Sequence, residues 1–373
     1  MTRTTLTWSE RFGQHDMGDW AIYVPPTGLV EPDVHVDNPK RTARLRRLIA
    51  KTGLEERLDV VAPRAASVEE IEAVHTHEHV SAMAAVSEAG WGDAGGGFTP
   101  MNADSYELAL LSAGSVITCV ERVLEGEADR AYAIGRRSGH HASADTGYGF
   151  CIFNNVAVAA AAARRAGVER IAIVDIDAHH GNGTESIFYE DPAVLTVSLH
   201  EDRMFPLETG AAADRGGPGA EGANLNVPLA AGTGDGGYHY AVDRLVIPAL
   251  DAFEPELLLV VAGVDAAMYD PLSTLGLTAG GYGEVAEKLV AVAERHCGGR
   301  VVFEQEGGYN HVYSPFCWLK LIEVLADAPR SEDPFGPFLE GAGFNFLAPH
   351  QRELVDRLAA ELGAPAAAPS PPA

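Results

Sequence analysis

The sequence is poor in cysteine and in positive charge. It has four cysteines, too few and too widely spaced for a disulfide framework or a CxxC metal site, so a reducing cytoplasmic location is expected. Only 27 Lys and Arg residues stand against 53 Asp and Glu residues, a formal net charge of −26. Because nucleic-acid binding draws most of its affinity from cations that neutralise phosphates, no direct nucleic-acid partner is expected. Cationic or neutral partners fit the charge better.

Long hydrophobic runs are also lacking. The most apolar stretches, Val156–Ala163 and Leu257–Val264, are well short of the ~20 residues that span a bilayer. Residues 1–16 carry charged side chains throughout and no apolar segment of the kind found in signal peptides. Neither membrane binding nor secretion is therefore expected.

The chain does contain enough apolar sequence for a sizeable core, with 46% hydrophobic residues in a length of 373. Short apolar runs alternate with longer stretches of helical periodicity, which predicts an α/β fold with a mostly parallel sheet. We expect strands over 130–134, 171–175, 194–199, 257–262 and 301–304, and helices over 106–124, 154–166, 237–253, 280–297 and 315–325. One domain over residues 1–362 and a disordered Ala/Pro-rich tail over 363–373 are predicted.

Candidate metal ligands stand where predicted strands end, the usual place for ligand sites in open α/β sheets. Asp177 and His179 are two residues apart, so their side chains face the same side of an extended segment. Asp265 follows the apolar run 257–262 and offers a third ligand. Taken singly, such residues are often turn or capping residues. Together they predict a zinc site with a coordination position open to water, as in catalytic zinc centres.

Two further groups follow other predicted strands. His140 and His141 are adjacent, and the residues alone leave open a metal pair, a proton-transfer pair or a surface doublet. Hydrolysis of an amide by an activated water requires a base and an acid, which a histidine pair can supply, with Asp175 and Asn182 to orient the rings. Tyr309 follows two glycines and could donate a hydrogen bond to an oxyanion, although a buried aromatic beside a turn is the simpler interpretation.

Six segments, in order along the chain, resemble the zinc-dependent histone deacetylase superfamily, in its class II-like branch of bacterial histone deacetylase-like amidohydrolases and acetylpolyamine amidohydrolases. They are Arg136–Ala142, Gly149–Asn155, Asp175–Thr184, Val197–His200, Ala262–Ala266 and Glu306–Tyr309. The resemblance implies a single catalytic domain over residues 1–362 with the arginase-like three-layer α/β/α fold. It also implies a zinc-dependent amidohydrolase.

The resemblance implies specific site residues. One zinc ion per chain would be held by Asp177, His179 and Asp265, with His140 and His141 as the paired histidines and Tyr309 polarising the scissile carbonyl. One structural potassium ion would lie at Asp175, Asp177, His179, Ser198 and Leu199, and a second at Phe188, Asp191 and Val194. The substrate would contact Gly149, Phe150, Phe205 and Leu272.

The substrate is predicted from Leu272. In polyamine-selective members of the superfamily a Glu stands at this position after Asp-Pro, and Leu272 offers no such charge, which favours an acylated lysine peptide or small acyl amide. Acids that could supply a charge at the rim are Asp19, Glu31, Asp93 and Asp104. Other interpretations are an acetylpolyamine amidohydrolase, a non-catalytic acyl-lysine or acylpolyamine binding protein and a dinuclear manganese ureohydrolase. A homo-oligomer is possible.

Overall fold

The computed structural model describes residues 2–136, 138–339 and 341–362. The tail predicted over 363–373 lies outside these described residues. Within the described ranges, no helix is both long and apolar enough to cross a membrane.

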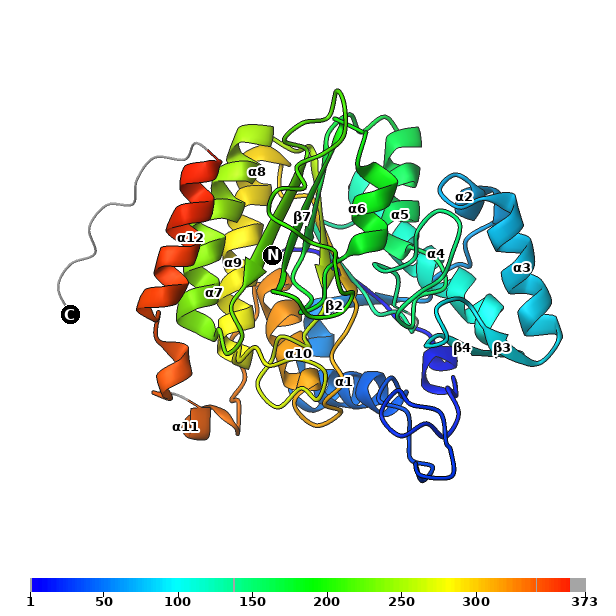
Figure 1. Ribbon diagram of the computed structural model, residues 1–373. Helices are drawn as coiled ribbons and strands as arrows, with labels where there is room; N and C mark the ends of the chain where they lie inside the picture. Colours follow the sequence, from blue (N-terminus) through cyan, green and yellow to red (C-terminus); the bar gives the residue numbers. More distant parts are fainter. Residues whose placement is uncertain (1, 137, 340, 363–373) are drawn as a thin grey trace.

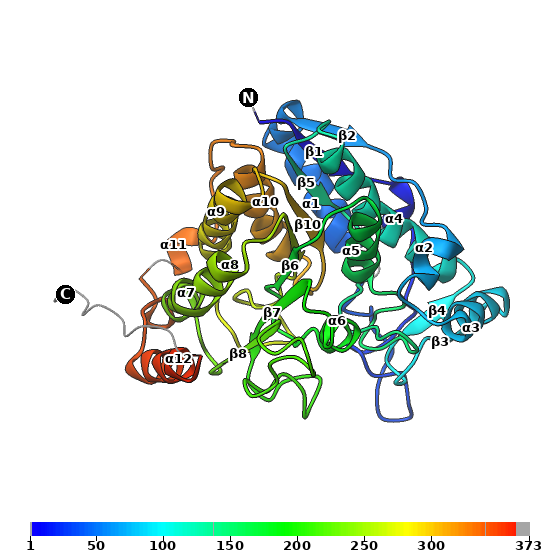
Figure 2. The same cartoon turned by 90° about the horizontal axis from the view of Figure 1, so that it is seen from above.

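An eight-stranded sheet forms the centre of the fold (Figures 1 and 2), and every pair of neighbouring strands in it is parallel. The order is β2-β1-β5-β10-β9-β6-β7-β8. The strands are β1 (Thr4–Thr7), β2 (Leu58–Val61), β5 (Arg130–Ala133), β6 (Ile171–Asp175), β7 (Val194–Glu201), β8 (Asn224–Leu229), β9 (Leu257–Ala262) and β10 (Val301–Gln305). The prediction of an α/β fold with a mostly parallel sheet is confirmed.

Helices cover both faces of the sheet, with α4 and α5 on one side and α8, α9 and α10 on the other (Figure 2). The helices are α1 (Lys40–Lys51), α2 (Val68–Glu72), α3 (His77–Glu88), α4 (Ser105–Leu124), α5 (Asn155–Arg165), α6 (Asn182–Phe188), α7 (Asp235–Ala241), α8 (Ile247–Phe253), α9 (Ala279–His296), α10 (Ser314–Leu325), α11 (Gly336–Leu339) and α12 (Pro349–Glu361). An antiparallel hairpin, β3 (Trp91–Asp93) and β4 (Pro100–Asn102), stands apart from the sheet. The side chains of β5, β6, β9 and β10 are buried on both faces, which explains their apolar sequences.

The predicted elements are all present, but one differs in form. The helix expected over 237–253 consists of α7, a π-helical turn at Val242–Val246 and α8. Pro248 lies in the first turn of α8 and lacks an N–H donor, which accounts for a local departure from α-helical hydrogen bonding.

The strands that were not predicted are polar or short. In β8, Asn224 and Asn226 are buried because both side-chain amides donate to Glu185, at 2.7 and 2.6 Å. In β1, the sequence Thr-Thr-Leu-Thr is buried although it is mostly polar, and Thr7 forms a hydrogen bond of 2.6 Å with Ser115 on α4. Hydrogen bonding of polar side chains, rather than apolar composition, places these strands in the sheet.

A carboxyl group is buried without a partner on β10. Glu304 is 2% exposed, and among the described residues neither of its carboxyl oxygens has a hydrogen-bond partner. Burial, followed by the nearby charges of Glu306 and Asp175, raises its pKa well above 4.5. Glu304 therefore retains its proton in the folded protein at a pH where the unfolded chain has released it.

We predict a pH-dependent gain in stability from Glu304→Gln. Because the pKa of Glu304 is raised in the folded state, its protonated form contributes fully to the stability of the parent protein below pH 4.5. As the pH rises, the free energy of unfolding falls by about 1.4 kcal/mol per pH unit for as long as only the folded state holds the proton. The amide side chain of the variant would not titrate. The midpoint of thermal unfolding of the variant, relative to the parent, should therefore rise as the pH increases above about 4.5.

Glu69→Gln, at an exposed position, is the control and should change the midpoint much less than Glu304→Gln does. If the difference in unfolding midpoint between Glu304→Gln and the parent does not change with pH, the raised pKa of Glu304 is contradicted.

Candidate metal-dependent active site

The candidate site lies at the carboxyl edge of the sheet, where five neighbouring strands end. His140 and His141 follow β5, Tyr309 follows β10, and Asp265 follows β9. Asp177 and His179 follow β6, and Phe205 follows β7. Because the strands are parallel and adjacent, their ends meet at one edge although the residues span much of the chain.

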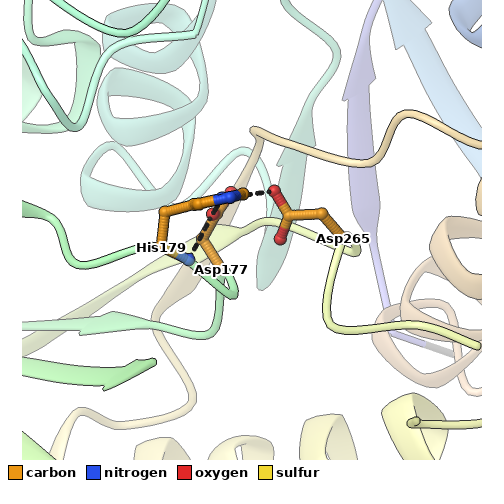
Figure 3. Close-up of side chains that lie close together, drawn as sticks. All are labelled: Asp177, His179 and Asp265. Atoms are coloured by element: carbon orange, nitrogen blue, oxygen red, sulfur yellow. Dashed lines mark hydrogen bonds and ion pairs between the residues drawn. The ribbon is translucent and has the colours of Figure 1, made fainter. Parts of the chain in front are cut away.

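Asp177, His179 and Asp265 form a buried cluster whose potential ligand atoms lie within 4.8 Å of one another (Figure 3). The His179 Nδ1 atom is 3.0 Å from a carboxylate oxygen of Asp177 and 3.0 Å from one of Asp265. Among the described residues this is the one group of three or more His, Cys, Asp or Glu side chains with such geometry.

Neighbouring backbone groups orient all three side chains. His179 Nε2 lies 3.1 Å from the Leu272 carbonyl, so an Nε2–H donor leaves Nδ1 free to bind a metal ion. The Ala178 N–H donates to Asp265 at 2.7 Å, and the Gly307 N–H donates to Asp177 at 3.0 Å. Position 307 requires glycine, because a Cβ atom there would collide with both carboxylates. Each carboxylate is therefore fixed by one oxygen and directs the other toward His179.

The electrostatics of this cluster suit a cation. Burial, followed by repulsion from Asp265, raises the pKa of Asp177 to about 6. Two buried carboxylates and one imidazole nitrogen are oxygen and nitrogen donors of the kind that divalent metal ions bind, and a bound cation would offset the repulsion. The residues present therefore fit a metal centre with three protein ligands.

His140 and His141 have different partners, as expected from the sequence. His140 Nδ1 lies 2.8 Å from the Asp175 carboxylate, whereas His141 Nδ1 lies 2.8 Å from the Asn182 side-chain oxygen. Burial lowers the pKa of His140, but the carboxylates of Asp175, Asp177 and Glu306 together outweigh burial, so the pKa is raised to about 10. Burial, followed by the charges of His140 and His179, lowers the pKa of His141 well below 6.5. At neutral pH the pair therefore holds one charged and one neutral imidazole.

Glu306 fixes the backbone of the histidine loop. Its carboxylate accepts hydrogen bonds from the N–H groups of Gly139 and His140, the latter at 2.9 Å. Arg41, which pairs with Asp37, donates to the carbonyls of Glu306 at 3.3 Å and Gly308 at 3.1 Å. Sequence reasoning did not assign these supporting roles, because a side chain that binds distant backbone groups leaves no spacing pattern.

A cavity of about 330 Å³ opens onto these residues. It is lined by Tyr23, Phe98, His141, Gly149, Phe150, His179, Met204, Phe205, Pro271, Leu272, Ser273, Thr274 and Tyr309. The predicted contact residues Gly149, Phe150, Phe205 and Leu272 are all among them. Tyr23, Phe98 and Met204 were not predicted to line it, and no motif in the sequence marks them.

The aromatic walls of the cavity are held in defined positions. Phe150 has a φ of +73°, which is unusual for a non-glycine residue, and its N–H donates to Thr99 at 3.1 Å. Gly149 has a φ of +53°, and a Cβ atom there would collide with the His141 ring. Phe205 stands perpendicular to the His141 ring at 5.1 Å between centroids. Gly149 and Phe205 therefore pack directly against His141, whereas the Phe150 ring contacts Tyr309 at 5.7 Å between centroids.

No lining residue of the described cavity is acidic. The Asp93 carboxylate instead accepts hydrogen bonds from the N–H groups of Gly95, Gly97 and Thr99, which stabilises the β3–β4 hairpin. The remaining candidate rim acids are exposed and outside the lining: Asp19, Glu31 and Asp104. The cavity thus offers aromatic and aliphatic side chains at its mouth.

Comparison with known proteins identifies the family. Residues 35–325 match the histone deacetylase domain. The chain belongs to the histone deacetylase family. It is 40% identical to a histone deacetylase-like amidohydrolase of Pseudomonas aeruginosa, over 97% of this chain and 96% of the relative. A probable deacetylase of Archaeoglobus fulgidus is 38% identical, over 78% of this chain and 81% of the relative.

Solved structures agree with this assignment. The crystal structure of the HDA15 HD domain superimposes with a TM-score of 0.81 and 31% identity, covering 97% of this chain and 98% of that one. The predicted arginase-like α/β fold and the predicted enzyme class are therefore confirmed. The protein is a hydrolase of the deacetylase and amidohydrolase type.

Proposed function

We propose that this enzyme is a zinc-dependent deacylase that hydrolyses the amide bond of N-acyl-lysine-type substrates. One observation supports it above all. A three-ligand metal cluster, two histidines with different partners and Tyr309 stand together, and His141, His179 and Tyr309 all line the same cavity. Turnover of acetyl-lysine peptides, abolished by a chelator and restored by Zn²⁺, tests the proposal. If the protein binds acylated peptides but does not hydrolyse them, the result would instead support the alternative of a non-catalytic acyl-lysine binding protein.

When bound by Asp177, His179 and Asp265, zinc supplies a Lewis acid for the acyl carbonyl and lowers the pKa of water toward ~7. His141, neutral and facing the cavity, takes the proton from the attacking water and later delivers it to the leaving amine. His140, charged beside Asp175, stabilises the developing negative charge. Burial and the nearby charge of Asp265 raise the pKa of Tyr309 well above 10, so its hydroxyl keeps its proton and can donate to the oxyanion.

Two potassium sites are also proposed. The first potassium ion would be bound by Asp175, Asp177, His179, Ser198 and Leu199. The pairing of Asp175 with Ser198 on the adjacent strands β6 and β7 supports this set of ligands. At the second position, Phe188, Asp191 and Val194 lie in consecutive turns, with hydrogen bonds of 2.9 and 3.2 Å between their backbones. Each accepting carbonyl retains a lone pair for a cation.

We predict one zinc ion per chain. His179→Ala should remove metal and deacylase activity together, because a site with three protein ligands cannot spare one. Metal analysis of the purified proteins measures this. His296→Ala is a suitable control, since it also removes a histidine paired with a carboxylate, that of Asp251 at 2.8 Å on α8. Full zinc and normal turnover in His179→Ala would refute the ligand set, and two manganese ions per chain would favour a ureohydrolase.

Tyr309→Phe should lower kcat by ~10²–10³, the usual cost of losing one oxyanion donor, while zinc content and KM change little. Tyr240→Phe is the matched control, because it removes a hydroxyl that donates to Asp356 at 2.6 Å and lies outside the cavity lining. Steady-state kinetics on an acetyl-lysine peptide distinguish the two. Undiminished kcat in Tyr309→Phe would exclude the role given to this hydroxyl.

The parent enzyme should prefer acetyl-lysine peptides to N-acetylated polyamines, because the mouth of the cavity has no carboxylate to meet a distant ammonium group. Leu272→Glu would add one and should shift the ratio of kcat/KM toward polyamines by roughly tenfold, from ~1–3 kcal/mol of ion pairing. Leu272→Gln has a similar shape without the charge and should leave the ratio near that of the parent. A parent that already favours polyamines more than about tenfold would contradict this substrate assignment.

A further inference from the structure

We infer that Asp270 is a positioning residue that sets the place of Tyr309 in the active site. The inference rests on the proposed deacylase function. Asp270 belongs to neither the metal ligands nor the cavity lining, and it is 8% exposed. It lies in the turn after β9 that carries Leu272, opposite the segment after β10 that carries Tyr309.

The Asp270 carboxylate connects these two segments. One oxygen accepts the N–H of Leu272 at 3.0 Å. The other accepts the N–H of Tyr309 at 2.6 Å and the N–H of Asn310 at 3.3 Å. A single buried side chain therefore satisfies three backbone donors that belong to two different loops. The backbone of the two segments is also joined nearer the strand ends, where the Val264 N–H donates to the Gly307 carbonyl at 2.8 Å.

The connection is reciprocal. The Asn310 side-chain amide donates back to the Tyr269 carbonyl at 2.7 Å, so each segment contributes one side chain that binds the backbone of the other. The Asn310 side-chain oxygen also accepts the N–H groups of Val312 and Tyr313, each at 3.0 Å, at the start of α10. Movement of the Tyr309 backbone would therefore break contacts on both sides of this connection.

Both ends of the connection bear on the reaction. The Leu272 carbonyl lies 3.1 Å from His179 Nε2, and Tyr309 lines the cavity. Asp270 thus holds the group that orients a metal ligand and the proposed oxyanion donor in one fixed relation. A catalytic hydrogen bond depends steeply on donor position, so a small displacement of the Tyr309 backbone reduces kcat more than it reduces substrate binding.

A double-mutant cycle tests this inference. Asp270→Asn should lower kcat by roughly tenfold or more in the parent, with KM and zinc content little changed. In the Tyr309→Phe background the same substitution should lower kcat by a clearly smaller factor, because the hydroxyl that Asp270 positions is already absent and only the contact through Leu272 remains. Equal factors in the two backgrounds would overturn the inference.

Asp93→Asn is the matched control, since Asp93 also accepts three backbone N–H bonds but within the β3–β4 hairpin. Its effect on kcat, whatever its size, should be the same with and without the Tyr309 hydroxyl. If Asp270→Asn does not fold, Asn310→Ala removes the return bond to Tyr269 and should show the same dependence on Tyr309. Absence of turnover in the parent would refute the deacylase function, whereas additive effects in an active parent refute only the role of Asp270.

Discussion

The active site depends on the burial of two carboxylates, Asp177 and Asp265, beside one imidazole. Two negative charges so close together in a region of low dielectric constant repel each other, and desolvation adds to the cost. A divalent cation would offset both effects. Without a cation, the surrounding chain must hold the cluster in place. Backbone donors from Ala178 and Gly307 perform that function.

Most of the supporting contacts around the site are of this kind, an acidic side chain that binds main-chain N–H groups. Glu306 binds the histidine loop in this way, and Asp175 accepts the N–H of Asp177 at 3.0 Å. Strand ends explain the pattern. Where parallel strands stop, their loops carry N–H groups that no longer pair within the sheet, and buried carboxylates satisfy them. The same acids give the site its negative potential, which suits a metal ion and a cationic partner.

The core strands and the candidate metal cluster could be predicted because each depends on a local pattern. Strands buried on both faces have continuous apolar sequences, and a spacing of two residues directs Asp177 and His179 to one side. The polar strands β1 and β8 could not be predicted in this way, since side chains such as Asn224 are buried through hydrogen bonds to residues in other segments of the chain. Likewise, Tyr23 and Phe98 reach the cavity only through the arrangement of the N-terminal segment and the hairpin.

His140 and His141 are chemically identical side chains that differ in pKa, in part because one is paired with an Asp and the other with an Asn. A carboxyl group, that of Asp175, contributes with Asp177 and Glu306 to the raised pKa of His140, whereas the amide of Asn182 can only orient His141. The charge on His140 then further lowers the pKa of His141, which lies 4.0 Å away between ring centroids. Because the other oxygen of Asp175 accepts the N–H of Asp177, the same carboxylate ties the charge state of the pair to the position of the metal ligands. The proposed acid–base pair and the candidate metal cluster are therefore one electrostatic unit, in which a change at Asp175 would alter both parts at once.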